Sequence, residues 1–242
     1  MLAIKGTELT KCYKDIIAVD KLNLEIIKGE LFSLLGVNGA GKTTTIKMLS
    51  CLTGATRGDA LVGGCSIVRE PHLVKRLIGV SPQETAVAPN LSVKENLELI
   101  CGIHGFSKRK TEAKVRELAD HFGLDSILQR NAGKLSGGWQ RRLSVAMALI
   151  SEPQILFLDE PTIGLDVIAK HDLWEMIRSL KGKMTIILTT HYMEEAQALS
   201  DRIGIMKNGS LLAVGTAAEL MTRAGCQDFE SAFVSIVKEG NV

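Results

Sequence analysis

The amino-acid sequence predicts an α/β fold with a mainly parallel core sheet, an antiparallel β portion towards the N-terminus and an inserted helical subdomain. Two observations lead to this fold. Short apolar stretches with strand character alternate with helical stretches along much of the chain, as in parallel α/β sheets. Residues 92–150, by contrast, are mainly helical in pattern. We expect one domain, 1–242, with core parts at residues 1–83 and 151–215, the helical subdomain at 84–150 and a helical tail at 216–242.

The predicted strands are short, and several are apolar throughout. Residues 22–27 alternate between apolar and polar side chains, as expected of a strand with one buried face. Residues 203–207 and 211–214 flank Asn208-Gly209, a dipeptide that favours the tight turn of a β-hairpin. The other strand candidates are residues 30–35, 78–81, 155–158 and 184–189.

Two capping boxes, in which a Ser or Thr precedes a Glu by three residues, mark helix starts. Ser92 with Glu95 begins a helix of the subdomain, and Thr216 with Glu219 begins the tail. An apolar stripe near the C-terminus is interpreted as a helix face packed on the domain's own core, and it consists of Phe229, Phe233, Ile236 and Val237. Further helices are predicted at residues 42–51, 111–122, 170–180 and 193–199.

Composition excludes several classes of protein. The net charge of +2 and the 4% of aromatic residues give no basis for a nucleic-acid partner. The five cysteines are scattered and lack the spacing of a disulfide framework or a zinc site. The N-terminus is too charged for a signal peptide, and no apolar run reaches the roughly 18 residues of a membrane span. We therefore expect a soluble or peripheral protein.

The stretch GVNGAGKTT fits the pattern G-x-x-x-x-G-K-[ST], between a predicted strand and a predicted helix. In such a loop, backbone N–H groups and the helix N-terminus bind phosphate oxygens. Lys42 is expected to reach the β- and γ-phosphates, and the Thr43 hydroxyl to bind Mg²⁺. The predicted phosphate-binding residues are Gly36, Val37, Asn38, Gly39, Ala40, Gly41, Lys42, Thr43 and Thr44.

A second motif, ILFLDEP, follows the phosphate loop in the sequence and contains two acidic residues. Asp159 emerges at the end of a buried strand, where a carboxylate can hold Mg²⁺ through water. Glu160 is adjacent and can orient or deprotonate the attacking water. These residues predict a Mg²⁺-dependent P-loop NTPase. A kinase and a GTPase are the rivals, and the absence of an Asn-Lys-x-Asp motif counts against a GTPase.

Further motifs, in order along essentially the whole chain, resemble the nucleotide-binding subunit of ATP-binding cassette (ABC) proteins. LSGGWQRR resembles the family signature, and SPQE carries Gln83 at the Q-loop position. GLD, ending at Asp166, resembles the D-loop, and TTHYMEEA carries His191 at the switch-histidine position. Tyr13 resembles the aromatic residue that stacks on adenine. The resemblance therefore implies that ATP, with Mg²⁺, is the nucleotide.

The resemblance also implies roles for single residues, each with a plainer alternative. Gln83 becomes a sensor of Mg²⁺ and the γ-phosphate, although it can be an ordinary loop residue. His191 becomes a ligand of the γ-phosphate that holds the attacking water in line with Glu160, whereas a lone histidine after a strand is usually structural. Tyr13 stacks on adenine or is a half-buried strand aromatic, and Ala18 is a candidate for the adenine pocket.

Two positions depart from the family pattern. Trp139 follows the second signature glycine, where Gln is usual, and this puts the ribose contacts in doubt. Val167 follows the D-loop where Pro is common, and it should be tolerated because a helix begins there. By resemblance, members of the exporter-type branch vary at the position of Trp139, so this departure does not indicate a dead site. Lys42, Asp159, Glu160 and His191 are all present, which argues against a scaffold that does not hydrolyse ATP.

The signature glycines imply a second copy of the cassette. Ser136, Gly137 and Gly138 begin a helix and can donate to a phosphate. By resemblance, this phosphate belongs to the ATP of another subunit packed head to tail, and Asp166 lies across the seam. A homodimer is the default because both halves of the site are intact, and a heterodimer stays open.

The resemblance further implies that the chain drives a separate membrane permease, docked on the helical insert near residues 83–105. The protein would then lie in the cytoplasm, peripheral on the inner face of the cell membrane. PNLSVKENLELICGIHG and the tail resemble the exporter-type branch, which includes drug, antibiotic and sodium efflux. The alternatives are a non-transport ABC ATPase of translation or DNA repair and a scaffold that does not hydrolyse ATP.

Overall fold

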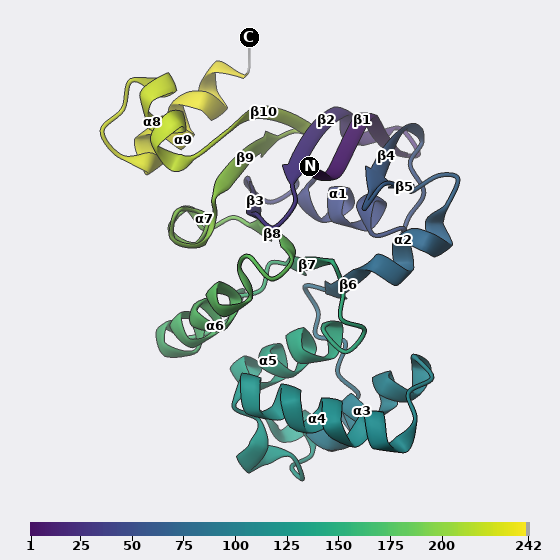
Figure 1. The fold of residues 1–242 in the computed structure, drawn as a ribbon. Helices are drawn as coiled ribbons and strands as arrows, with labels where there is room; N and C mark the ends of the chain where they lie inside the picture. The colour runs from purple at the N-terminus through teal and green to yellow at the C-terminus, as the bar shows by residue number, and fades with distance from the viewer. Residues whose placement is uncertain (241–242) are drawn as a thin grey trace.

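The computed structural model describes residues 1–240, and within them two β-sheets are surrounded by helices (Figure 1). The strands are β1 (Leu2–Tyr13), β2 (Ile16–Ile27), β3 (Leu31–Leu35), β4 (Arg57–Val62), β5 (Cys65–Ser66), β6 (Ile78–Ser81), β7 (Ile155–Asp159), β8 (Thr185–Thr190), β9 (Arg202–Lys207) and β10 (Ser210–Gly215). The α-helices are α1 (Lys42–Leu49), α2 (Pro71–Leu77), α3 (Val93–Ile103), α4 (Lys108–Phe122), α5 (Gly137–Ala148), α6 (Val167–Leu180), α7 (Met193–Leu199), α8 (Ala217–Ala224) and α9 (Phe229–Glu239). Two short 3₁₀ helices lie at Asp125–Ile127 and Ala132–Lys134.

The larger sheet has the strand order β10-β9-β3-β8-β7-β6. Its strands from β9 to β6 run parallel, and only β10 pairs antiparallel, with β9, through the predicted hairpin. Every residue of β3, β7 and β8 is buried, since helices and the second sheet cover both faces. The short apolar runs within these strands made them recognisable in the sequence. The predicted mainly parallel core sheet is confirmed.

The smaller sheet has the order β2-β1-β4-β5, and its pairs are antiparallel. This confirms the antiparallel β portion near the N-terminus. One expectation for its strands was wrong, however. The strand expected at residues 22–27 starts at Ile16, and strand β1, which ends at Tyr13, was not predicted. Register shifts within β1, between Gly6 and Leu9 among others, interrupt the alternation that would have revealed this strand.

Helices α3, α4 and α5 form a lobe at one end of the molecule, joined to the sheets by the segments after β6 and before β7 (Figure 1). Both predicted capping boxes are formed, at the starts of α3 and α8. Helix α4 begins at Lys108, earlier than predicted, because the Ser107 side chain caps it. Helix α6 likewise begins at Val167, ahead of the predicted residue 170. The exact division of the chain into core, subdomain and tail stays a prediction.

The C-terminal helices α8 and α9 pack on the edge of the larger sheet. Phe229, Phe233 and Ile236 are buried in one cluster with Ile203 and Ile205 of β9. The apolar stripe therefore faces the domain's own core, as predicted. Residues 241–242 of the predicted tail lie outside the described residues. Within residues 1–240, no helix is long and apolar enough to span a membrane.

Candidate functional site

The predicted phosphate loop connects β3 to α1, and close packing explains two of its glycines. A Cβ atom on Gly36 would lie 2.4 Å from the backbone oxygen of Met206. Gly41 adopts a φ of 101°, and a Cβ atom there would lie 2.6 Å from the backbone oxygen of Ala18. No other residue fits such positions without displacing the backbone. The loop is thereby pressed against β9 and β2 at the carboxyl end of β3.

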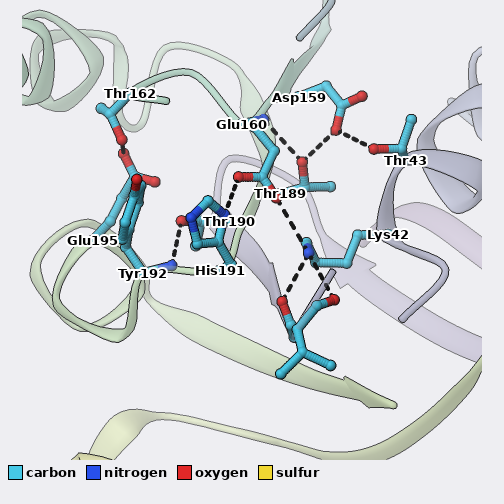
Figure 2. A network of polar contacts seen from close by, with 12 residues as sticks. Lys42, Thr43, Asp159, Glu160, Thr162, Thr189, Thr190, His191, Tyr192 and Glu195 are labelled. Carbon is cyan, nitrogen blue, oxygen red and sulfur yellow. Dashed lines mark hydrogen bonds and ion pairs between the residues drawn. The ribbon is translucent and has the colours of Figure 1, made fainter. Parts of the chain in front are cut away.

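Lys42 lies at the start of α1 and is only 5% exposed. Its Nζ atom donates hydrogen bonds to the backbone oxygens of Gly36, at 2.7 Å, and Val37, at 3.3 Å. It also forms an ion pair with Glu160 Oε1 at 3.2 Å, which is visible in Figure 2. Burial makes such a pair depend on both partners, because a lone charge in this position would be poorly solvated. The phosphate loop and the end of β7 are thus held together by charge.

Asp159 is the last residue of β7, and its Oδ1 atom accepts two hydrogen bonds. Thr43 Oγ1 of α1 donates at 2.9 Å, and Thr189 Oγ1 of the neighbouring strand β8 donates at 2.5 Å (Figure 2). Asp159 and Thr189 are direct partners in the parallel pairing of β7 with β8. The hydroxyl of Thr43 and the carboxylate of Asp159 are therefore neighbours, with hard oxygen atoms suited to Mg²⁺.

Glu160 follows β7 and has a φ of 49°, in the left-handed region. Its backbone N–H donates to the Thr189 side chain at 3.0 Å and to the Thr189 backbone oxygen at 3.1 Å. These bonds turn the side chain back across the sheet edge, where Oε2 lies 2.5 Å from Nδ1 of His191. Glu160 is 6% exposed, whereas a quarter of the His191 side chain is open to solvent. Lys42, Glu160 and His191 therefore form one contiguous network (Figure 2).

A cavity of about 620 Å³ lies beside this network. Several predicted residues line it, namely Tyr13, Ala18, Asn38, Gly39, Ala40, Gly41, Lys42, Thr43, Thr44, Gln83 and Glu160. Tyr13 is half exposed, and the Lys11 ammonium lies 4.9 Å from the centre of its ring. Sequence reasoning missed other lining residues, which are Ile16, Ile17, Ile163 and Asn208. The cavity therefore has a polar phosphate-loop end and an apolar end around Tyr13.

Gln83 enters the cavity from the segment that leads into the helical lobe. Arg141 of α5 donates hydrogen bonds to the backbone oxygen of Pro82, at 2.6 Å, and to that of Gln83. Arg141 is buried, and burial lowers the pKa of its guanidinium, while the charges of Asp159 and Glu195 oppose this shift. The helix of the signature motif thus holds the backbone of the Gln83 segment.

The signature residues lie apart from this cavity. Ser136 and Gly137 are exposed at the start of α5, and none of the residues from Ser136 to Gly138 lines the cavity. Ser136 occupies the N-cap position, yet its side chain makes no capping hydrogen bond. The start of α5 packs instead on α6, since a Cβ atom on Gly138 would lie 2.9 Å from Cβ of Ala169. Backbone N–H groups at a helix start are a ready donor set for an anion.

Asp166 is exposed and also lies outside the cavity. Its side chain accepts a hydrogen bond from the backbone N–H of Ala169 at 2.9 Å and so caps helix α6. Within the described chain, the predicted site residues thus fall into two groups. One group lines the cavity or, as for Gly36, Val37, Asp159 and His191, is bonded to a residue that lines it. The other group lies at the exposed starts of α5 and α6.

The network also contains residues that sequence reasoning missed. Thr189 binds both Asp159 and Glu160, and Thr162 binds the buried carboxyl group of Glu195. A pair of threonines at the end of the buried strand β8, directly before His191, was a signal for hydroxyl groups at the sheet edge. No comparable signal marked Thr162 or Glu195, since their contact joins residues far apart in the sequence.

The sequence family described as ABC transporter matches residues 19–163. The doxorubicin resistance ATP-binding protein DrrA of Mycobacterium tuberculosis is 42% identical over 225 residues, covering 93% of this chain and 68% of DrrA. The Nod factor export ATP-binding protein I of Rhizobium etli is 41% identical over 233 residues, covering 95% of this chain and 73% of that protein.

Solved structures agree with this assignment. The ATP-binding subunit of an ABC transporter superposes with a TM-score of 0.85 and 27% identity, covering 97% of this chain and 99% of that chain. A dimeric ATP-binding cassette in a post-hydrolysis state, bound to ADP and Pi, superposes with a TM-score of 0.80 and 27% identity, covering 88% and 98%. This chain therefore belongs to the ABC transporter family, as one of its ATP-binding and ATP-hydrolysing subunits.

Proposed function

We propose that the cavity beside the phosphate loop binds ATP with Mg²⁺ and that Glu160 and His191 carry the hydrolysis. The observation behind this proposal is the contiguous network of Lys42, Glu160 and His191 at the ends of α1, β7 and β8. The phosphate loop from Gly36 to Thr44 holds the phosphates through its N–H groups, and Lys42 binds the β- and γ-phosphates. The ring of Tyr13, at the apolar end of the cavity, stacks on the adenine.

Thr43 and Asp159 fit a Mg²⁺ site, because their oxygen atoms already lie 2.9 Å apart. Few protein ligands suffice, since Mg²⁺ in phosphate sites keeps several waters and binds phosphate oxygens. Gln83 reaches the same cavity from the other side and completes the proposed ligand set. When bound, Mg²⁺ would neutralise charge on the phosphates.

Glu160 orients the attacking water and accepts its proton as bond formation to the γ-phosphorus proceeds. The orientation of its carboxylate is already fixed, because Lys42 binds one of its oxygen atoms and His191 binds the other. His191 contacts the γ-phosphate from its exposed side and keeps the water in line. Asp159 accepts hydrogen bonds from Thr43 and Thr189, and its role in this proposal is to hold Mg²⁺.

The second part of the site comes from another cassette. The exposed start of α5, with Ser136, Gly137 and Gly138, would donate to the γ-phosphate of ATP bound by a second chain, and Asp166 would lie at the seam. Ser136 is the N-cap residue of α5, but its side chain makes no capping hydrogen bond. This observation supports the proposal, because the hydroxyl can bind another partner. A homodimer suffices, since one chain carries both groups of residues. ATP then joins two chains, and hydrolysis releases them.

The dimer would drive a separate membrane permease in export, from the cytoplasm at the inner face of the cell membrane. A groove of about 410 Å³ lies between the helical lobe and the core, with Leu52 on one side and Ala86, Ile100 and His104 on the other. Leu52 is 61% exposed, and the neighbouring Ile103 is 71% exposed. This surface suits an apolar segment of a permease. The relatives named for drug resistance and Nod factor export support the export direction.

The test is the substitution Glu160→Gln, which keeps the size of the side chain and removes the base. Turnover should fall roughly 10²- to 10⁴-fold, because general-base catalysis is lost while ATP binding survives. The variant should then accumulate as an ATP-bound dimer, detectable by light scattering. Glu194→Gln is the matched control, because it makes the same change on an exposed neighbour of the site. A monomeric Glu160→Gln variant in saturating ATP would contradict the shared site.

The same variant tests the partner. Extracted with ATP from native membranes in mild detergent, tagged Glu160→Gln should bring a multi-span membrane protein with it. Co-purification of soluble partners alone, such as ribosomes, would instead favour a non-transport ABC ATPase and leave the ATP chemistry in place.

A further inference from the structure

Glu195 is a buried glutamate that the chemistry above does not use. It lies on α7 with no exposed surface, and its Oε1 atom accepts two hydrogen bonds. Thr162 Oγ1 donates at 2.8 Å and Trp174 Nε1 at 3.0 Å. Within residues 1–240, Oε2 has no hydrogen-bond partner. A buried polar atom without a partner is uncommon in native proteins and calls for an explanation.

The position of Glu195 between two turns of the site suggests a role for this residue. Thr162 belongs to the turn that begins at Glu160, which is closed by the hydrogen bond from Ile163 N–H to the Glu160 backbone oxygen at 3.2 Å. On the other side, α7 follows directly after the turn that carries His191. The contact between Thr162 and Glu195 therefore connects the same two turns that meet in the contact between Glu160 and His191 (Figure 2).

We propose that Glu195 is a positioning residue. Through its hydrogen bond with Thr162, it fixes the position of the turn that carries Glu160 relative to the turn that carries His191. This inference rests on the proposed function, because it takes Glu160 and His191 as the groups that act on water and the γ-phosphate. During hydrolysis, water and the γ-phosphate would also contact the partly exposed His191 side chain, and they would compete with its contact to Glu160. The buried Thr162–Glu195 contact is shielded from these changes and keeps the spacing.

The surroundings of Glu195 agree with this role. Burial raises the pKa of its carboxyl group, while the side chains of Thr190, Trp174 and Thr162 act in the opposite direction. Both donors from Thr162 and Trp174 converge on a single oxygen atom, Oε1. A Gln side chain offers the same acceptor, so Glu195→Gln should leave the link largely intact.

The two donors to Oε1 provide a matched pair of variants. Thr162→Val removes the hydroxyl that leads to the Glu160 turn, and Trp174→Phe removes the indole N–H that leads only to α6. Both delete one buried hydrogen bond to the same oxygen atom. A merely structural Glu195 would respond alike to the two changes, whereas a positioning residue responds to Thr162→Val. Thr162→Ser keeps the hydroxyl and controls for the change of shape.

The experiment measures ATP turnover and the ring resonances of His191 in the full chain. For Thr162→Val we expect kcat to fall roughly tenfold, since misplaced catalytic groups cost rate, with the KM for ATP changed less than about twofold. The His191 resonances should shift in Thr162→Val but stay in place in Trp174→Phe and Thr162→Ser. His191→Gln assigns the resonance among the five histidines of the chain.

The outcomes separate this inference from the proposed function. If Glu160→Gln loses turnover while Thr162→Val behaves like Trp174→Phe in kcat and in the His191 resonances, the positioning role is wrong and the proposed function stands. If Glu160→Gln keeps full turnover, the proposed function fails and the positioning role fails with it. Loss in both Glu160→Gln and Thr162→Val, with Trp174→Phe and Thr162→Ser near the parent chain, supports both.

Discussion

The phosphate-loop region and the signature region both contain a helix start, but they differ in how many side-chain bonds each makes within its own chain. At the start of α1, Lys42 is buried and bound to three oxygen atoms, and Thr43 is bound to Asp159. At the start of α5, Ser136 and Gly137 are exposed and the serine side chain caps nothing. The chain thus bonds two polar side chains internally at one helix start and leaves the serine side chain of the other without a bond to its own helix.

The N-cap side chains of other helices show that Ser136 differs from them. The N-cap side chains of α3, α4, α6, α8 and α9 all accept a hydrogen bond from their own helix. Ser136 has the right residue type for the same bond and does not make it. The unused cap at Ser136 is therefore one of the observations that support the proposed contact with ATP on a second chain. Three substitutions test the contrast between the two helix starts.

Lys42→Ala should have the largest effect. It removes the charge that meets the phosphates and leaves Glu160 buried without its cation. We expect turnover to fall at least about 100-fold, in line with the loss of a preorganised electrostatic contact, and nucleotide titrations to show weakened ATP binding. Lys47→Ala, an exposed lysine on the same helix, should change neither quantity. Unchanged ATP affinity and turnover in Lys42→Ala would refute the phosphate loop.

Gly137→Asp should separate the two regions. A Cβ atom at Gly137 has only Leu165 Cδ2 nearby, at 3.8 Å, and a carboxylate at a helix start is favourable, so the fold is retained. The single chain should bind ATP as before, but the new charge would repel the γ-phosphate of a second chain. We expect turnover to fall about 10- to 100-fold, with dimer formation lost in light scattering.

The control for this change is Gly102→Asp, at a position of the same lobe where a Cβ atom meets nothing within 4 Å. It should leave ATP binding, dimer formation and turnover of the purified chain unaltered. Equal turnover in Gly137→Asp and Gly102→Asp would mean that the signature region takes no part in hydrolysis.

Asp172→Asn should have the smallest effect. Asp172 of α6 binds Arg142 of α5 at 2.5 Å and is half exposed, with Arg142 mostly covered. Partly exposed ion pairs of this kind contribute little, so urea unfolding should show a loss below about 1 kcal/mol. The packing of Gly138 on Ala169 should hold α5 in place without the pair. A fall in turnover as large as in Gly137→Asp would show instead that this ion pair sets the position of the signature helix.

The parts of the fold that sequence predicted well are those buried on both sides. Strands β3, β7 and β8 are buried throughout and carry short apolar runs, and their predicted positions agree with the structure to within a residue or two. Strand β1 is interrupted by register shifts, and α2 buries only Val74, so neither gives a clear period. The apolar pattern of α6 predicted a start only at residue 170, whereas the motif that ends at Asp166 correctly placed a helix start at Val167.

The site divides in a similar way. Lys42, Thr43, Asp159 and Glu160 lie in short contiguous motifs, and the sheet brings these motifs together. Thr189, Thr162 and Glu195 depend on contacts between strands and helices far apart in the sequence. Hydroxyl groups are common in any sequence, and only the fold reveals which of them fix a carboxylate.

The backbone of Glu160 has a consequence for the evolution of the chain. A φ of 49° is uncommon for a residue with a side chain, and such conformations cost on the order of 1 kcal/mol or more. Glycine would relieve this cost, since it adopts positive φ freely. Losing the glutamate alone would, however, leave the buried Lys42 ammonium without its carboxylate partner, which costs more than the strain that glycine relieves. The ion pair therefore keeps a strained residue at position 160, and the chain cannot lose this glutamate without a second change at Lys42.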